Sequence, residues 1–181
     1  MYDAGVDRSA ELRLPTIVVQ VRLCLIGQAP RAAELFMADV ARRGRARLLD
    51  DLAELLDAGA AFVPARVDGG VRLLSKHAVA WVAVDRRAAG DPGAEPPELP
   101  EELSDASALY DRQHRVSIDL AHGPGLVGLL LDSAPADRPR VIDHLNRPGM
   151  FVRLWTPDAH VLVNKQQIIS VADLGTAGGP A

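Results

Sequence analysis

The chain repeats itself, and this repetition restricts its possible folds more than any other feature. Six residues between Arg45 and Leu52 match, in order and spacing, six residues between Arg138 and Leu145. After a gap of four residues the correspondence resumes. Two ordered blocks predict two copies of one structural unit. The other matched pairs are Val21 with Val116, Leu23 with Ile118, Leu25 with Leu120, Leu35 with Leu130, Phe62 with Phe151, Val63 with Val152, Leu73 with Leu162, Lys76 with Lys165, Val79 with Ile168, and Val82 with Val171.

Composition separates these copies from the chain between and after them. We expect the first unit at residues 14–85 and the second at residues 112–174. The stretch 86–111 is predicted to be a linker, because from residue 90 onward it has seven acidic residues, several prolines and no Lys or Arg. The small, glycine-rich end at 175–181 is expected to be a flexible tail.

Each copy is predicted to be mainly β-structure, in a β-rich α+β class. Apolar and polar residues alternate along 17–25 and 116–120, with the period of a half-buried strand. The segments 71–84 and 161–171 are rich in β-branched residues, and each can hold two strands around a tight bend. Between the strands, leucines at 48–56 follow helical spacing, which predicts a short inserted helix.

Charge and composition exclude several functional classes. A net charge of −4 disfavours general binding to nucleic acid. The single cysteine, Cys24, allows no internal disulfide, and the acidic first residues do not resemble a secretory signal. The longest apolar run, at 17–26, is too short to span a membrane. A cytoplasmic location and no contact with a membrane are therefore expected.

The sequence offers little for an enzyme to use. The run Gly123–Gly128 satisfies the glycine pattern of dinucleotide-binding proteins, but Pro124 lacks an amide hydrogen, so a turn between two strands is the preferred interpretation. Cys24 is better interpreted as a surface or interface thiol than as a nucleophile. The five histidines show no metal-binding spacing. No catalytic residue, metal or cofactor is expected.

Two Arg and Asp pairs recur at equivalent positions, Arg47 with Asp50 and Arg140 with Asp143. Because both copies have the pair, a structural ion pair or helix cap is favoured over a single catalytic site. A basic cluster lies just before the first pair. Its residues are interpreted as a solvated loop, with phosphate contact as the alternative, and they include Arg42, Arg43 and Arg45.

The second copy begins with a segment, Val116–Gly123, that resembles the first strand of the Sm-like proteins, in particular the bacterial RNA chaperone Hfq. Leu126–Gly128 and Ser133 continue the likeness. In the first copy, Leu74–Val79 is similar to the second motif of that family, in which a Lys-His turn joins the last two strands. The matching segment of the second copy, Asn164–Ile168, keeps the lysine but not the histidine.

The resemblance implies tandem Sm-like or SH3-like β-barrels of five bent strands, here with an inserted helix that the family lacks. In that family, rings form when an edge strand of one subunit pairs with its neighbour, so the resemblance implies such pairing between the two halves, between chains, or both. The resemblance also places four residues near an RNA-binding rim, although an exposed hairpin turn is the simpler interpretation. These residues are Lys76, His77, Lys165 and Gln166.

Two functions follow as hypotheses. The first is a non-enzymatic assembly or regulatory module, which binds a protein partner or associates with copies of itself. The alternative is RNA binding through the rim residues and the basic cluster. The low aromatic content, 4%, limits base stacking and disfavours this alternative.

Overall fold

The computed structural model describes residues 16–38, 48–85, 112–132 and 140–176. These ranges hold ten strands, two α-helices and two short 3-10 turns. In chain order the elements are β1 (Thr16–Leu25), β2 (Arg31–Ala38), α1 (Leu48–Asp57), β3 (Phe62–Val67), β4 (Gly70–Ser75), η2 (Lys76–Ala78), β5 (Val79–Asp85), β6 (Arg112–Leu120), β7 (Leu126–Asp132), α3 (Val141–Leu145), β8 (Phe151–Trp155), β9 (Ala159–Asn164), η4 (Lys165–Gln167) and β10 (Ile168–Thr176).

All ten strands belong to one antiparallel sheet, in the order β10-β6-β7-β8-β9-β5-β1-β2-β3-β4. The prediction of a mainly β fold is therefore confirmed. Within the described residues the sheet remains open in both halves, so closed barrels are not found there. In each half the last strand pairs with the first, but β5 pairs on its other side with β9 rather than with β4.

The N-terminal half (β1 to β5) and the C-terminal half (β6 to β10) have the same order of elements and the same strand register. Phe62 lies opposite Ser75 in the β3–β4 ladder, and the matching Phe151 lies opposite Asn164 in the β8–β9 ladder. An irregularity where β1 meets β5 recurs where β6 meets β10. The correspondence seen in the sequence thus extends to individual hydrogen-bonded ladders.

The inserted helix differs in length between the halves. Helix α1 has ten residues and α3 has five, so the four-residue gap in the sequence corresponds to about one turn of helix. Leu52 and Leu56 of α1 are buried in the N-terminal half. The shorter α3 lays Val141 and Leu145 against the core of the C-terminal half.

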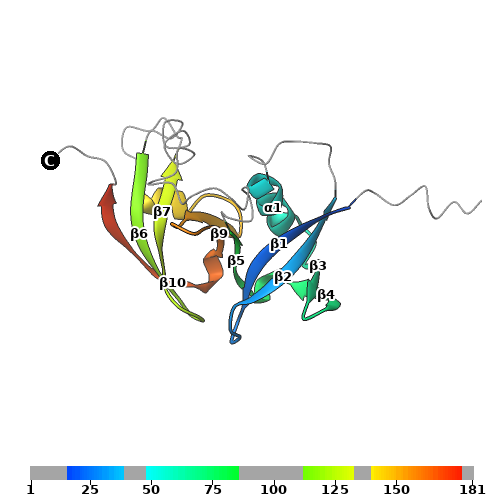
Figure 1. Ribbon diagram of the computed structural model, residues 1–181. Coiled ribbons are helices and arrows are strands. Elements are labelled where there is room, and N and C mark those ends of the chain that lie inside the picture. The colour runs from blue at the N-terminus through cyan, green and yellow to red at the C-terminus, as the bar shows by residue number, and fades with distance from the viewer. Residues whose placement is uncertain (1–15, 39–47, 86–111, 133–139, 177–181) are drawn as a thin grey trace, which may run out of the picture.

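Strands β5 and β9 lie at the centre of the sheet (Figure 1), and two hydrophobic cores meet there. Strand β5 is buried on both faces, since Val82 packs in the core of the N-terminal half and Trp81 packs in that of the C-terminal half. Likewise, Leu162 and Phe151 come from the C-terminal half but pack in the N-terminal core. The two halves therefore share a buried region.

The described elements bear on two further sequence predictions. The Gly123–Gly128 run connects two antiparallel strands and enters β7 rather than a helix, as the turn interpretation predicts. Among the described helices, none has the length and apolar character needed to cross a membrane. The predicted linker at 86–111 lies outside the described residues.

Candidate assembly interface

The two halves join through a ladder between β5 and β9, which we call the seam. Five residue pairs form it, from Trp81 opposite Val163 to Asp85 opposite Ala159. The buried side chain of Asn164 donates a 2.8 Å hydrogen bond from Nδ2 to the carbonyl oxygen of Val79 across the seam. A buried polar group with a satisfied partner fixes one register, because a slipped strand would leave that group unpaired.

Asp57 adds a second polar contact between the halves. It is the last residue of α1, and its Oδ1 accepts hydrogen bonds from the main-chain N–H groups of Met150, at 2.7 Å, and Phe151, at 3.3 Å. Sequence reasoning missed this residue. A signal was present, because a carboxylate at the C-terminal end of a helix opposes the helix dipole and so requires another stabilising contact.

The structure shows what the two predicted rim lysines do. Lys76 is only 2% exposed, and its ammonium donates hydrogen bonds to the carbonyl oxygens of Leu55 and of Ala58, the latter at 3.0 Å. Lys165 donates to the carbonyl oxygen of Arg147 at 2.6 Å. Both ammonium groups therefore hold the carboxyl end of an inserted helix against the sheet. Lys76 is buried, whereas Lys165 remains half-buried.

Burial shifts the titration of both lysines in the same direction. Desolvation lowers the pKa of Lys76, and the nearby Asp57 carboxylate opposes that shift. Desolvation also lowers the pKa of Lys165, Asp57 opposes this shift, and the Arg147 guanidinium adds to it. Asp57 is thus electrostatically linked to the equivalent lysine of each half.

This shift predicts a pH-dependent stability. The folded chain should release the Lys76 proton at lower pH than the unfolded chain, so the unfolded state holds more protons as the pH rises toward 10.5. Between the lowered pKa of Lys76 in the folded chain and 10.5, we expect the free energy of unfolding of the wild type to increase with pH relative to that of a Lys76→Met variant. Urea denaturation at several pH values measures this difference. A His77→Ala variant is the control and should follow the wild type; a constant difference between wild type and Lys76→Met would contradict the assignment.

The other two predicted rim residues meet each other. His77 and Gln166 occupy equivalent positions in the two halves, and His77 Nδ1 lies 3.2 Å from Gln166 Oε1. Both residues are exposed. The structure therefore brings equivalent positions of the two halves side by side.

Of the two predicted Arg and Asp pairs, only one can be followed. Asp143 Oδ2 accepts a 3.1 Å hydrogen bond from the main-chain N–H of Arg140, so the carboxylate caps the start of α3 without using the guanidinium. Asp50 lies in α1, but its side chain is not described. The remaining arginines of the prediction lie outside the described residues, namely Arg42, Arg43, Arg45 and Arg47.

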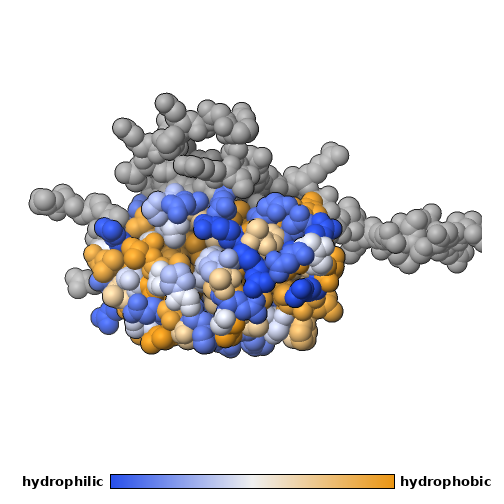
Figure 2. All heavy atoms as spheres, turned by 60° about the horizontal axis from the view of Figure 1, so that its bottom comes forward, coloured by the Kyte–Doolittle hydropathy of each residue, from blue (hydrophilic) through white to orange (hydrophobic). Residues whose placement is uncertain are grey.

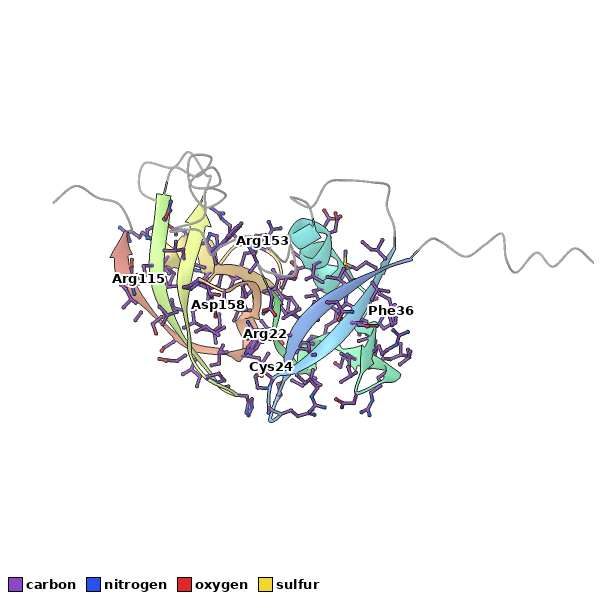
Figure 3. The ribbon with its side chains drawn as sticks, in the orientation of Figure 1. Arg22, Cys24, Phe36, Arg115, Arg153 and Asp158 are labelled. Carbon is purple, nitrogen blue, oxygen red and sulfur yellow. The ribbon has the colours of Figure 1, made fainter. Side chains whose placement is uncertain are left out.

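Cys24 lies on β1 opposite Trp81 of β5, near Arg22 (Figure 3). Strand alternation turns the thiol away from the core of its own half, as the sequence predicts. It is nevertheless fully buried, because it packs in the core of the C-terminal half. Burial raises the pKa of the thiol, which disfavours the reactive thiolate. The interface interpretation therefore describes Cys24 better than the surface or nucleophile interpretation.

The outermost strands of the described sheet are β4 and β10, which lie at opposite ends of the molecule (Figure 1). Leu73 on β4 is 72% exposed, whereas the equivalent Leu162 is 1% exposed at the seam. Phe62 is 56% exposed, whereas the equivalent Phe151 is 7% exposed. On β10, Ile169 is 70% exposed. Hydrophobic side chains also gather at both lateral margins of the face in Figure 2.

A hollow of about 220 Å³ lies beside the start of β10. Leu145, Asn146, Lys165 and Ile168 line it.

Among the described residues, no group of three or more His, Cys, Asp or Glu side chains could hold a metal ion. Neither a family of known proteins, nor a curated protein, nor a solved structure matches the chain. Its function must therefore be inferred from its own geometry.

Proposed function

We propose that the chain is a self-assembling module, in which β4 of one copy pairs with β10 of the next. One observation carries this proposal. The seam already joins the strand equivalent to β4, which is β9, to the strand equivalent to β10, which is β5. A second copy would therefore extend the sheet by making the same kind of joint between chains.

The seam also predicts the register between chains. At the seam Val82 lies opposite Leu162. Transferred to the equivalent positions, Val171 of one copy lies opposite Leu73 of the next. This register covers the exposed leucine and satisfies the main-chain N–H and C=O groups along two outer strands.

Burial provides the driving force for such a joint. An exposed row of apolar side chains at a strand edge promotes aggregation unless another surface covers it. Covering Leu73 and Phe62 as their equivalents are covered at the seam removes apolar area from water at about 25 cal/mol per Å². Because the two edges differ, the joint is heterologous, and repeated addition gives either a closed ring or an open filament.

The resemblance to Sm-like proteins supports the same proposal. Each half has five strands, and an edge of one half pairs with an edge of the other, which is what the resemblance implies. RNA binding receives less support. The ammonium groups of Lys76 and Lys165 already bind main-chain carbonyls just beyond the inserted helices, and His77 contacts Gln166. A charged rim open to phosphate would need other residues.

Light scattering of the purified chain at increasing concentration tests the proposal. We expect a species several times heavier than the 19.3 kDa chain, with its mass rising with concentration until a ring closes or a filament grows. Added single-stranded RNA should leave the mass unchanged. A chain that remains monomeric at hundreds of micromolar would refute self-assembly.

A further inference from the structure

The hollow beside β10 has an occupied equivalent in the N-terminal half. The positions that correspond to Asn146 and Lys165 are Asp57 and Lys76. There, Asp57 binds the main-chain N–H groups of Met150 and Phe151, and the Phe151 ring is buried in the adjacent core. The same place in the C-terminal half is a hollow.

The residues equivalent to Met150 and Phe151 are Ala61 and Phe62. Their backbone has the same local position, because Lys76 N–H donates to the Ala61 carbonyl at 3.0 Å, as Lys165 N–H donates to the Met150 carbonyl at 2.9 Å. The Phe62 ring is 56% exposed and packs in neither core. The chain therefore has a hollow equivalent to the place that Phe151 fills, and an exposed aromatic side chain, Phe62, equivalent to Phe151.

We propose that the hollow is a binding site for Phe62 of a second copy of this chain, an inference that rests on the proposed head-to-tail assembly. The ring packs against Leu145 and Ile168. The amide oxygen of Asn146 accepts hydrogen bonds from the main-chain N–H groups of Ala61 and Phe62. An aromatic anchor in a preformed pocket is the usual centre of a binding interface.

Asn146 stands at the position where the N-terminal half has Asp57. This difference makes the joint between chains weaker than the seam. Hydrogen bonds to a carboxylate are stronger than those to a neutral amide. Ser75 also weakens the joint between chains. It occupies the position of Asn164, which donates a hydrogen bond across the seam, and the shorter Ser75 side chain forms no cap hydrogen bond. Assembly through this site should therefore be reversible, whereas the seam is permanent.

A dimer with a single joint tests the site. A chain with Leu73→Glu keeps its hollow, and a chain with Ile169→Glu keeps its β4 edge and Phe62, so a mixture can form only one joint. Adding Phe62→Ala to the second chain should weaken its binding to the first about 30-fold, measured by sedimentation or calorimetry. Adding Asn146→Asp to the first chain should strengthen binding about tenfold. Val127→Ala, at an exposed position on β7, is the matched control and should change neither.

The outcomes separate this inference from the assembly proposal. If the dimer forms but Phe62→Ala and Asn146→Asp leave its affinity unchanged, the pairing of β4 with β10 stands and the Phe62 site is wrong. If the wild type never assembles, both are wrong. The fluorine NMR signal of 4-fluorophenylalanine at position 62, assigned with a Phe62→Leu variant, gives an independent measurement. It should move on dimer formation, whereas a ring that remains in water overturns the inference.

Discussion

A chain carrying Leu73→Glu and a chain carrying Ile169→Glu should each be monomeric alone and should form a one-to-one dimer when mixed. Each substitution places a carboxylate on the buried side of one predicted joint, where an unpaired charge costs several kcal/mol. Each variant retains the edge that the other has lost. Only one joint can then form, and growth stops at about twice 19.3 kDa. Light scattering of the separate and mixed proteins measures this directly.

The mixing result depends on the two edges being different. If copies joined through two β4 edges, Ile169→Glu would assemble like the wild type and only Leu73→Glu would be monomeric. Both substituted side chains are largely exposed within the single chain, so circular dichroism and the melting temperature should remain close to those of the wild type. A Val127→Glu chain is the matched control for an added surface carboxylate and should assemble normally. Failure of the mixture to dimerise would contradict a head-to-tail joint.

Much of the fold follows from the spacing of apolar residues. The alternation around Val21 and Leu23 predicts a strand, and the leucine spacing around Leu52 predicts a helix; both are present. The two matched blocks also predict the equivalent ladders, because a strand's register decides which side chains face the core. These features are local or depend only on comparing the chain with itself.

The seam could not be predicted in this way. All residues of β5 from Val79 to Val84 are buried, and a strand buried on both faces shows no alternation to indicate its second partner. The resemblance to Sm-like proteins predicts a barrel in each half, with edge pairing between the two halves, between chains, or both. The pairing of β5 with β9 instead depends on contacts more than seventy residues apart in the chain.

The candidate site shows the same limit. The sequence correctly singles out Lys76 and Lys165 as equivalent residues. The resemblance to Sm-like proteins places them near an RNA-binding rim, and the simpler interpretation is an exposed hairpin turn, but neither predicts that Lys76 is buried. The segment just after each inserted helix provides a carbonyl group, that of Ala58 or of Arg147, which accepts a hydrogen bond from one of these ammonium groups. A helical pattern in the sequence does not show where the helix ends relative to the sheet, so it does not reveal the role of these lysines.

Leu73 on β4 and Leu162 on β9 are equivalent residues, but we expect only Leu162 to contribute to the stability of the monomer. In an Ile169→Glu background, which keeps the chain monomeric, Leu162→Ala should lower the free energy of unfolding by about 3 kcal/mol, because it leaves a cavity in a closely packed core. Leu73→Ala should change it by less than about 0.5 kcal/mol, since that side chain is in water. Urea denaturation of the two variants under identical conditions gives the comparison.

The complementary measurement uses the dimer with one joint. When the Leu73→Ala, Ile169→Glu chain binds the Leu73→Glu chain, the truncated side chain lies in the joint, so affinity should fall although the stability of the monomer did not. Leu73 would then do between chains what Leu162 does within one. Equal losses of monomer stability for Leu73→Ala and Leu162→Ala would mean that Leu73 is already covered within its own chain. In that case β4 would not be an edge at which a second copy can bind.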